Sequence, residues 1–321
     1  MISSLADHAL LYALAMLVHL VWYAWPARPI TAQGLHRFLY TLGIKLNRKK
    51  RSAASLVWRG LIILLLILAT ATAAGYGLSL LARLAPPYSW AMEVIILAWL
   101  LRLIPAQQRL IHLSRALREQ GERPTTELAH RFEPMRDQPV DAYAALRRGA
   151  EDAVRAYTDL FLLGIAYLLG GLTVFVPLAC LSLCALFYGR STRETLAFGW
   201  AASRLWGGLL WPFERLAAAW LCFAALIAAQ CHPVKAWAGL NHWVGCRLRY
   251  QCVFATAADA CNIALGGPYR EHGEPVAAPW LGKGTAMTGL SDVLRLQWLL
   301  RVATALYALA MLGLALSLSA F

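Results

Sequence analysis

The residues best suited to meet a ligand are the glycines and prolines of Ala264–Gly284, which reads ALGGPYREHGEPVAAPWLGKG. This density of Gly and Pro predicts a loop and excludes a membrane span. The backbone amides of such a loop are free to meet a ligand or the end of a neighbouring helix. The alternative is a plain connector before the last helix, because Gly-Pro loops are common and most carry no chemistry.

A second group has the composition of a soft-metal site: Cys231, His232, His242 and Cys246. Its spacing is a Cys-His pair followed by HxxxC, whereas structural zinc sites present tighter CxxC-type pairs. We therefore predict no metal site. The seven cysteines lie mostly in or beside apolar helices, so we also expect no structural disulfides.

Three well-known catalytic patterns are absent from the sequence. It contains no GxxxxGK[ST] phosphate loop, no GxGxxG fingerprint and no nucleophile elbow. Gly282–Thr285 reproduces only the end of a phosphate loop and lacks the upstream glycine spacing. Any function must therefore rest on other residues and on the helices that position them.

Composition indicates a membrane protein. Of 321 residues, 60% are hydrophobic and 15% are charged, and the mean hydropathy is +0.53. Several runs reach the ~20 apolar residues that cross a bilayer, and they are Leu/Ala-rich without alternation, so the spans should be helices. We predict an all-α, polytopic helical bundle of about six transmembrane helices with cytoplasmic amphipathic helices, forming one domain over residues 1–321. The expected spans are residues 5–25, 58–84, 88–105, 159–188, 215–231 and 298–320.

The net charge of +13 follows the pattern of membrane topology. Ala27–Val57 contains seven basic residues and no acid, and basic residues gather in cytoplasmic loops. We therefore expect a multi-pass protein of a bacterial inner (cytoplasmic) membrane, with the lipid bilayer as partner and both termini outside. Nucleic acid is not an expected partner.

The remaining segments are expected to be partly helical. The polar cytoplasmic segment 106–157 should form two or three helices, broken near Gly121–Pro124 and Pro134–Pro139. Asp159–Tyr188 is either one long tilted span or a re-entrant one interrupted at Gly170–Gly171. The Trp/Gly-rich stretch Gly189–Glu214 is expected outside the membrane.

Several phrases, in order along nearly the whole chain, resemble the CobD/CbiB family of cobalamin-biosynthesis membrane proteins, to which the AmpE proteins are related. LGGP and PWLGKG within Ala264–Gly284 resemble the family's LGGPxxY…KPWIG ending. Phe198–Leu216 resembles FGxxxARLDDxxNxxPARL, and Arg28–Ile30 stands where the family has HPV. From Met135–Asp137 to Asp159, the chain resembles RDTxxLD…R…ESxxEN…D, with Arg147 and Glu151 in register.

The resemblance implies a function in late cobamide assembly. The family joins adenosylcobyric acid to aminopropanol or its phosphate in an ATP-dependent amide ligation, so ATP and Mg²⁺ are the cofactors if the chain is active. A corrinoid substrate and other cobamide-assembly enzymes are the implied partners. Acid groups would be supplied by Glu151 and Asp159, and an anion contact by Arg204. The implied backbone donors of the substrate site are Gly266, Gly267, Pro268, Tyr269, Trp280 and Gly282.

The chain departs from the family pattern where that pattern is acidic. Trp206, Gly207 and Leu210 replace two aspartates and an asparagine, and Cys184 replaces another aspartate. Each change removes an oxygen ligand that Mg²⁺ would need. We therefore predict an impaired catalytic site, with a non-catalytic AmpE-like membrane regulator or scaffold as the alternative.

Overall fold

The structure is a computed structural model. It describes residues 2–22, 41–42, 45, 52–84, 88–101, 103–132, 141–188, 197–241, 250–271, 274–276 and 278–320. Several predicted features lie outside the described residues. They are most of the basic loop Ala27–Val57, including Arg28–Ile30, and also Met135–Asp137, His242 and Cys246. The chain divides into two compact units: unit 1 (Met1–Leu101, Asp159–Trp211 and Tyr307–Phe321) and unit 2 (Arg102–Thr158 and Pro212–Leu306).

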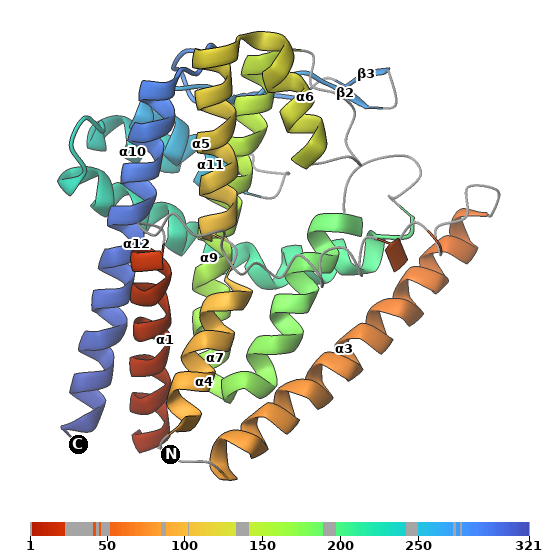
Figure 1. Cartoon of the computed structure of the whole chain (residues 1–321), viewed down its shortest axis with the longest axis vertical. Coiled ribbons are helices and arrows are strands. Elements are labelled where there is room, and N and C mark those ends of the chain that lie inside the picture. Colours follow the sequence, from red (N-terminus) through yellow and green to blue (C-terminus); the bar gives the residue numbers. More distant parts are fainter. Residues whose placement is uncertain are drawn as a thin grey trace. The chain divides into compact units, whose positions relative to one another are not determined.

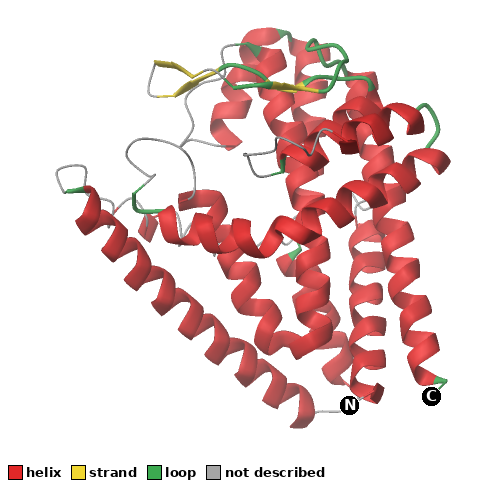
Figure 2. Cartoon of the chain, turned by 180° about the vertical axis from the view of Figure 1, so that it is seen from behind, coloured by secondary structure: helices red, strands yellow, loops and turns green. Residues whose placement is uncertain are grey.

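Helices make up almost all of the described chain, as the sequence predicts (Figures 1 and 2). Their bounds are α1 Ile2–Trp22, α3 Ala53–Leu84, α4 Tyr88–Leu100, α5 Leu103–Gln120, α6 Glu122–Phe132, α7 Ala142–Tyr188, α9 Trp200–Ile227, α10 Pro233–Leu240, α11 Gln251–Cys261 and α12 Leu290–Ser319. Of the two or three helices expected in the polar segment 106–157, α5 and α6 are present and are separated at Gly121, and α7 begins within the segment at Ala142.

Four helices of the described chain are long and apolar enough to cross a membrane: α3, α7, α9 and α12. A fifth span results if α4 and the following α5 count as one bent span, and Leu5–Val21 of α1 is a shorter apolar helix. Many outward-facing residues of these helices are large and apolar, as lipid contact requires, for example Leu65, Leu169, Phe223 and Leu316. The prediction of an all-α, multi-pass membrane bundle is confirmed.

The helix α7 is broken at Gly170 and Gly171. Gly170 has φ −144° and ψ 16°, and Gly171 has φ 55° and ψ −149°, so neither residue is helical. A positive φ is costly for residues with a Cβ, and glycine supplies it here. Within unit 1, the arms on either side of the break form a V (Figure 1). The interruption expected at Gly170–Gly171 is therefore observed.

The helix α9 corrects one expectation. Gly189–Glu214 is predicted to precede a helical span at 215–231, but a single helix already begins at Trp200, includes Pro212 and ends at Ile227. The glycines and Pro212 indicated a loop, but Leu205, Trp206, Leu209 and Leu210 recur at helical spacing. This periodicity outweighs the local breakers.

Short strands occur only between α11 and α12 in the described chain (Figure 2). Strand β1 (Leu265–Gly266) pairs antiparallel with β4 (Trp280–Leu281), and β2 (Tyr269–Glu271) pairs with β3 (Glu274–Val276). The predicted loop therefore has a defined shape. The β2–β3 pair lies between β1 and β4 in sequence, and the pairing of β1 with β4 brings the two ends of the loop together.

Candidate functional site

The site is built in unit 2, where the Gly/Pro loop meets one face of α7. Arg147 and Glu151 are four residues apart on α7, so both side chains lie on the same face of the helix. Glu151 Oε1 accepts a hydrogen bond from Gly266 N at 2.8 Å. Arg147 Nη1 donates to Ala286 O at 2.8 Å. The two side chains thus hold the beginning and the end of the loop to one helix.

Trp280 lies at the centre of this contact. The guanidinium carbon of Arg147 is 5.1 Å from the centroid of the Trp280 ring, a cation–π arrangement. Gly267 has φ 81°, and a Cβ there would stand 2.6 Å from the indole. The ring therefore occupies space that only glycine leaves open, while 48% of the tryptophan remains exposed.

The loop is also attached to α11. Asp259, buried in that helix, accepts a hydrogen bond from Lys283 N at 2.9 Å through Oδ1. Ile263 and Thr285 form a backbone bridge next to it. A Cβ on Gly282 would lie 2.5 Å from the Ala258 Cβ, so the loop backbone packs directly on the helix. Attachment at both α7 and α11 fixes the loop.

Two further carboxylates of unit 2 act in the same way. Glu214 Oε1 accepts from Cys252 N at 3.0 Å in the first turn of α11. Asp292 Oδ2 accepts from Gly289 N at 3.0 Å at the start of α12. Both satisfy backbone donors that a helix leaves without an intrahelical acceptor, and negative charge there is favoured by the helix dipole.

The loop amides are not available in the way the sequence suggested. Gly266 N is bonded to Glu151, Gly267 N donates to Pro279 O at 3.1 Å, and Lys283 N is bonded to Asp259. A loop with many glycines leaves its amides free only until it folds on its neighbours. Of the described loop, the exposed part of Trp280 is a group that a ligand could reach.

The structure brings together part of the predicted site. Glu151, Gly266, Gly267, Trp280 and Gly282 share unit 2 and the contacts above. Pro268 is exposed, and Tyr269 lies in β2.

Asp159 and Arg204 belong to unit 1. Asp159 is buried in α7, and Arg204 is exposed on α9.

Sequence reasoning missed Asp259 and Glu214. Each is a single acid within an apolar run, AADAC and WPFERLAAA respectively. A buried carboxylate must be hydrogen-bonded or paired to be tolerated. The isolated position of each acid within an apolar run was the signal that could have revealed it. This signal indicates a hydrogen-bond partner within the protein rather than a ligand.

No cluster of three or more His, Cys, Asp or Glu side chains in the described residues could hold a metal ion. The candidate pair Cys231 and His232 is described, but its proposed partners His242 and Cys246 are not.

The fold therefore defines a class: an all-α, multi-pass membrane protein with a tied-down Gly/Pro loop in unit 2. Comparison with family models, with curated proteins and with solved structures found no match for the chain.

Proposed function

We propose that this chain is a multi-pass protein of the bacterial inner membrane, related to CobD/CbiB, which serves late cobamide assembly by holding a corrinoid at unit 2. In this proposal the ATP-driven attachment of aminopropanol or its phosphate is impaired. The support is the resemblance of the motifs together with the way two of them meet in the fold.

One observation carries the proposal: the hydrogen bond from Gly266 N to Glu151 Oε1 joins residues 115 positions apart in sequence. These are two of the segments in which the chain resembles the family. Segments with a shared function are expected to converge, whereas an ordinary connector has no reason to be fastened to a charged helix face.

The hydrogen bonds that the carboxylates of unit 2 already accept from the backbone favour ligand binding without catalysis. Amide ligation through a phosphorylated carboxyl needs oxygen ligands for Mg²⁺ beside the phosphates. Glu151, Asp259, Glu214 and Asp292 each accept a backbone hydrogen bond instead. Turning one of them towards a metal would leave a backbone donor unpaired, which costs ~1–3 kcal/mol when the donor is buried.

The side chains at the loop fit a large, flat and polar-edged ligand. Trp280 offers a partly exposed aromatic surface, and Arg147 places a positive charge beside it. Indole rings pack well on flat apolar groups, and a guanidinium recognises carboxylate or phosphate. A corrin with its acid or phosphate-bearing arm combines both features.

The test is a titration of the detergent-purified full chain with adenosylcobyric acid and with adenosylcobinamide phosphate, followed by corrin absorbance. Trp280→Ala should weaken corrinoid binding by about tenfold, which corresponds to a loss of roughly 1.4 kcal/mol of binding free energy when the aromatic contact with the ligand is removed. Trp237→Ala is the matched control, since Trp237 is an exposed tryptophan of the same unit on α10, and it should bind as the parent does.

Complementation of a synthase-null strain separates binding from catalysis. The proposal predicts corrinoid binding without complementation. Growth of the complemented strain would show an active amide ligase, and Glu151→Gln and Asp159→Asn should then abolish it.

A second candidate is a non-catalytic regulator or scaffold resembling the AmpE proteins. The observation in its favour is the same internal use of the acidic groups, which needs no corrinoid to explain it. A folded chain that binds neither corrinoid would support this candidate and contradict the first.

A further inference from the structure

Two cysteines of unit 2, far apart in sequence, are held next to each other. Cys231 follows the C-terminal turn of α9, and Cys261 is the last residue of α11. His232 N donates to Ala260 O at 2.8 Å, so a backbone hydrogen bond joins the residues adjacent to the two cysteines. In α10, a Cβ on Gly239 would lie 2.8 Å from Ala255 O of α11. The backbone on both sides of the pair is therefore fixed.

The two thiols belong to neighbouring segments and differ in accessibility. Cys261 is fully buried, whereas Cys231 is partly exposed, and both are reduced. A disulfide requires Cβ atoms about 3.8 Å apart, and the backbone hydrogen bond between His232 and Ala260 holds the two cysteines close enough for a small rearrangement to form one.

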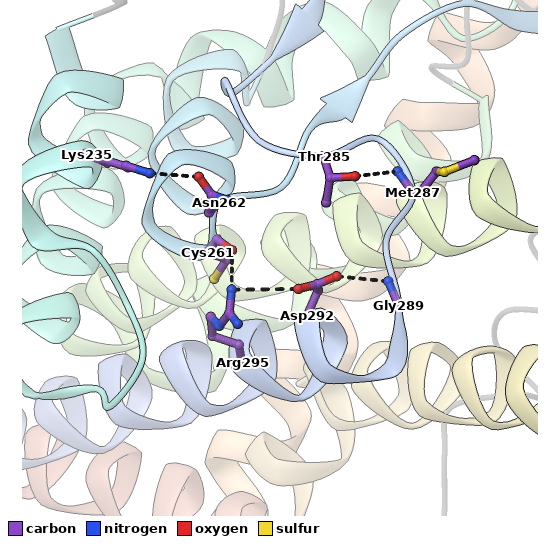
Figure 3. A network of polar contacts seen from close by, with 8 residues as sticks. All are labelled: Lys235, Cys261, Asn262, Thr285, Met287, Gly289, Asp292 and Arg295. Carbon is purple, nitrogen blue, oxygen red and sulfur yellow. Dashed lines mark hydrogen bonds and ion pairs between the residues drawn. The ribbon is translucent and has the colours of Figure 1, made fainter.

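The surroundings favour a thiolate on the accessible member. The hydrogen bond from Cys261 lowers the pKa of Cys231, against the opposing effect of burial, and the charge of Arg295 lowers it further. The same hydrogen bond and burial raise the pKa of Cys261. Arg295 is held in place because its Nη1 donates to Cys261 O at 2.9 Å and lies 3.7 Å from Asp292 Oδ1 (Figure 3).

We propose that Cys231 and Cys261 form a reversible dithiol–disulfide site, with Cys231 as the attacking sulfur, Cys261 as the resolving sulfur and a low-molecular-weight disulfide as the oxidant. The Cys231 thiolate attacks one sulfur of that disulfide, forms a mixed disulfide and releases one thiolate. Cys261 then loses its proton and attacks Cys231, which breaks the mixed disulfide and releases the second small thiol. The small disulfide is reduced by two electrons, and the protein pair is oxidised by two.

The other described cysteines do not offer this geometry. Cys180 and Cys184 lie four residues apart on α7, where Cβ atoms are ~5–6 Å apart, too far for a disulfide without distorting the helix. Cys222 and Cys252 are both buried.

Oxidation would have a local structural consequence. Asn262 follows Cys261, and its side chain accepts a hydrogen bond from Lys235 Nζ at 2.8 Å (Figure 3). The next residues enter the bridge with Thr285 and strand β1. A bond between Cys231 and Cys261 would therefore join the end of α9 covalently to the base of the Gly/Pro loop. This inference does not depend on corrinoid binding.

The experiment treats the reduced, detergent-purified full chain with oxidised glutathione, blocks the remaining thiols with a maleimide mass tag, and identifies peptides by mass spectrometry. A Cys246→Ser background removes the cysteine outside the described residues. This parent should lose two thiols and yield a peptide that links Cys231 to Cys261. Cys261→Ser should stop at a glutathione adduct on Cys231, and Cys231→Ser should leave Cys261 reduced.

Cys252→Ser is the control and should behave as the parent does. A parent that keeps both thiols, or that carries a stable glutathione adduct on Cys231 with Cys261 intact, overturns the proposal. The parent measurement alone decides the matter if a cysteine variant fails to fold.

Discussion

Unit 1 buries tyrosine rings against one another, whereas unit 2 buries carboxylates against backbone amides. In unit 1, Tyr307 stacks on Phe161 with ring centroids 4.3 Å apart, and Tyr12 donates to Leu160 O at 2.8 Å. In unit 2, Glu151, Glu214 and Asp259 each fasten one segment to another through a backbone N–H. Rings hold helices together through area and shape, while a carboxylate can hold an irregular loop that has no apolar face.

This difference indicates where ligand chemistry belongs in the molecule. Packed rings leave little room for a ligand, as Gly164 shows: a Cβ there would lie 2.7 Å from both Tyr12 and Tyr307. The loop of unit 2 is anchored at a few points and keeps side chains such as Trp280 partly exposed. The two kinds of contact should respond differently to substitution.

The largest effect is expected in the aromatic core of unit 1. Phe161→Ala removes a buried ring and should lower the free energy of unfolding by ~3–5 kcal/mol. Phe161→Leu, the matched control, keeps most of the volume and should lose much less. Thermal unfolding in detergent, followed by circular dichroism, measures both. Equal losses for the two variants would show that packed ring area is not what holds this unit.

The next effect concerns a carboxylate of unit 2. Glu214→Ala leaves Cys252 N without its acceptor and should cost ~1–3 kcal/mol. Glu214→Gln retains an acceptor oxygen and should cost less. The same unfolding assay compares them. If Gln is as damaging as Ala, the negative charge matters rather than the hydrogen bond.

A smaller and local effect is expected at Gly267. With φ 81° and the indole at 2.6 Å from an added Cβ, Gly267→Ala should cost on the order of 1–3 kcal/mol, felt mainly in the loop. Trypsin cleavage at Arg270 should become faster. Gly289→Ala is the control, because its nearest neighbour would be an ordinary 3.8 Å contact with Asp292. Faster cleavage in the control as well would rule out a specific role for the contact with Trp280.

The smallest effect on folding is expected at the dithiol, where pH should change reactivity alone. Cys231 faces Cys261 and Arg295, both of which lower its pKa. Lowering the pH protonates the thiolate, so alkylation by iodoacetamide should slow only below the range at which an ordinary thiol, with pKa ~8.5, loses reactivity. Cys261→Ala should move the midpoint of the rate profile upward. An unchanged midpoint in that variant would contradict the hydrogen bond from Cys261.

Much of the helical framework was accessible from the sequence. Long apolar runs predict spans because a bilayer leaves no alternative for the backbone, and the break at Gly170–Gly171 follows from two adjacent residues without a Cβ. The predicted start of this helix at residue 215 was wrong. Pro212 and the glycines suggested a loop, but the helical periodicity of the leucines prevailed, and α9 begins at Trp200.

The candidate site was predictable only in part. Glu151 and the Gly/Pro loop were named from motifs. No local pattern shows that the Gly266 amide donates a hydrogen bond to the Glu151 carboxylate, which lies 115 positions away in sequence. The buried role of Asp259 likewise depends on a contact with Lys283, which only the folded chain brings into reach. Long-range pairing of this kind has no signature in local spacing.

The contact between Glu151 and Gly266 is the central claim, and hydrogen–deuterium exchange of the peptide covering Ala264–Gly284 tests it most directly. Glu151→Ala should strip protection from this peptide, and Glu151→Gln should retain part of it because an acceptor oxygen remains. Glu127→Ala, at an exposed acid on α6, should leave exchange unchanged. Identical exchange in the parent and Glu151→Ala would mean that the carboxylate does not hold the loop, and the account of unit 2 would fail.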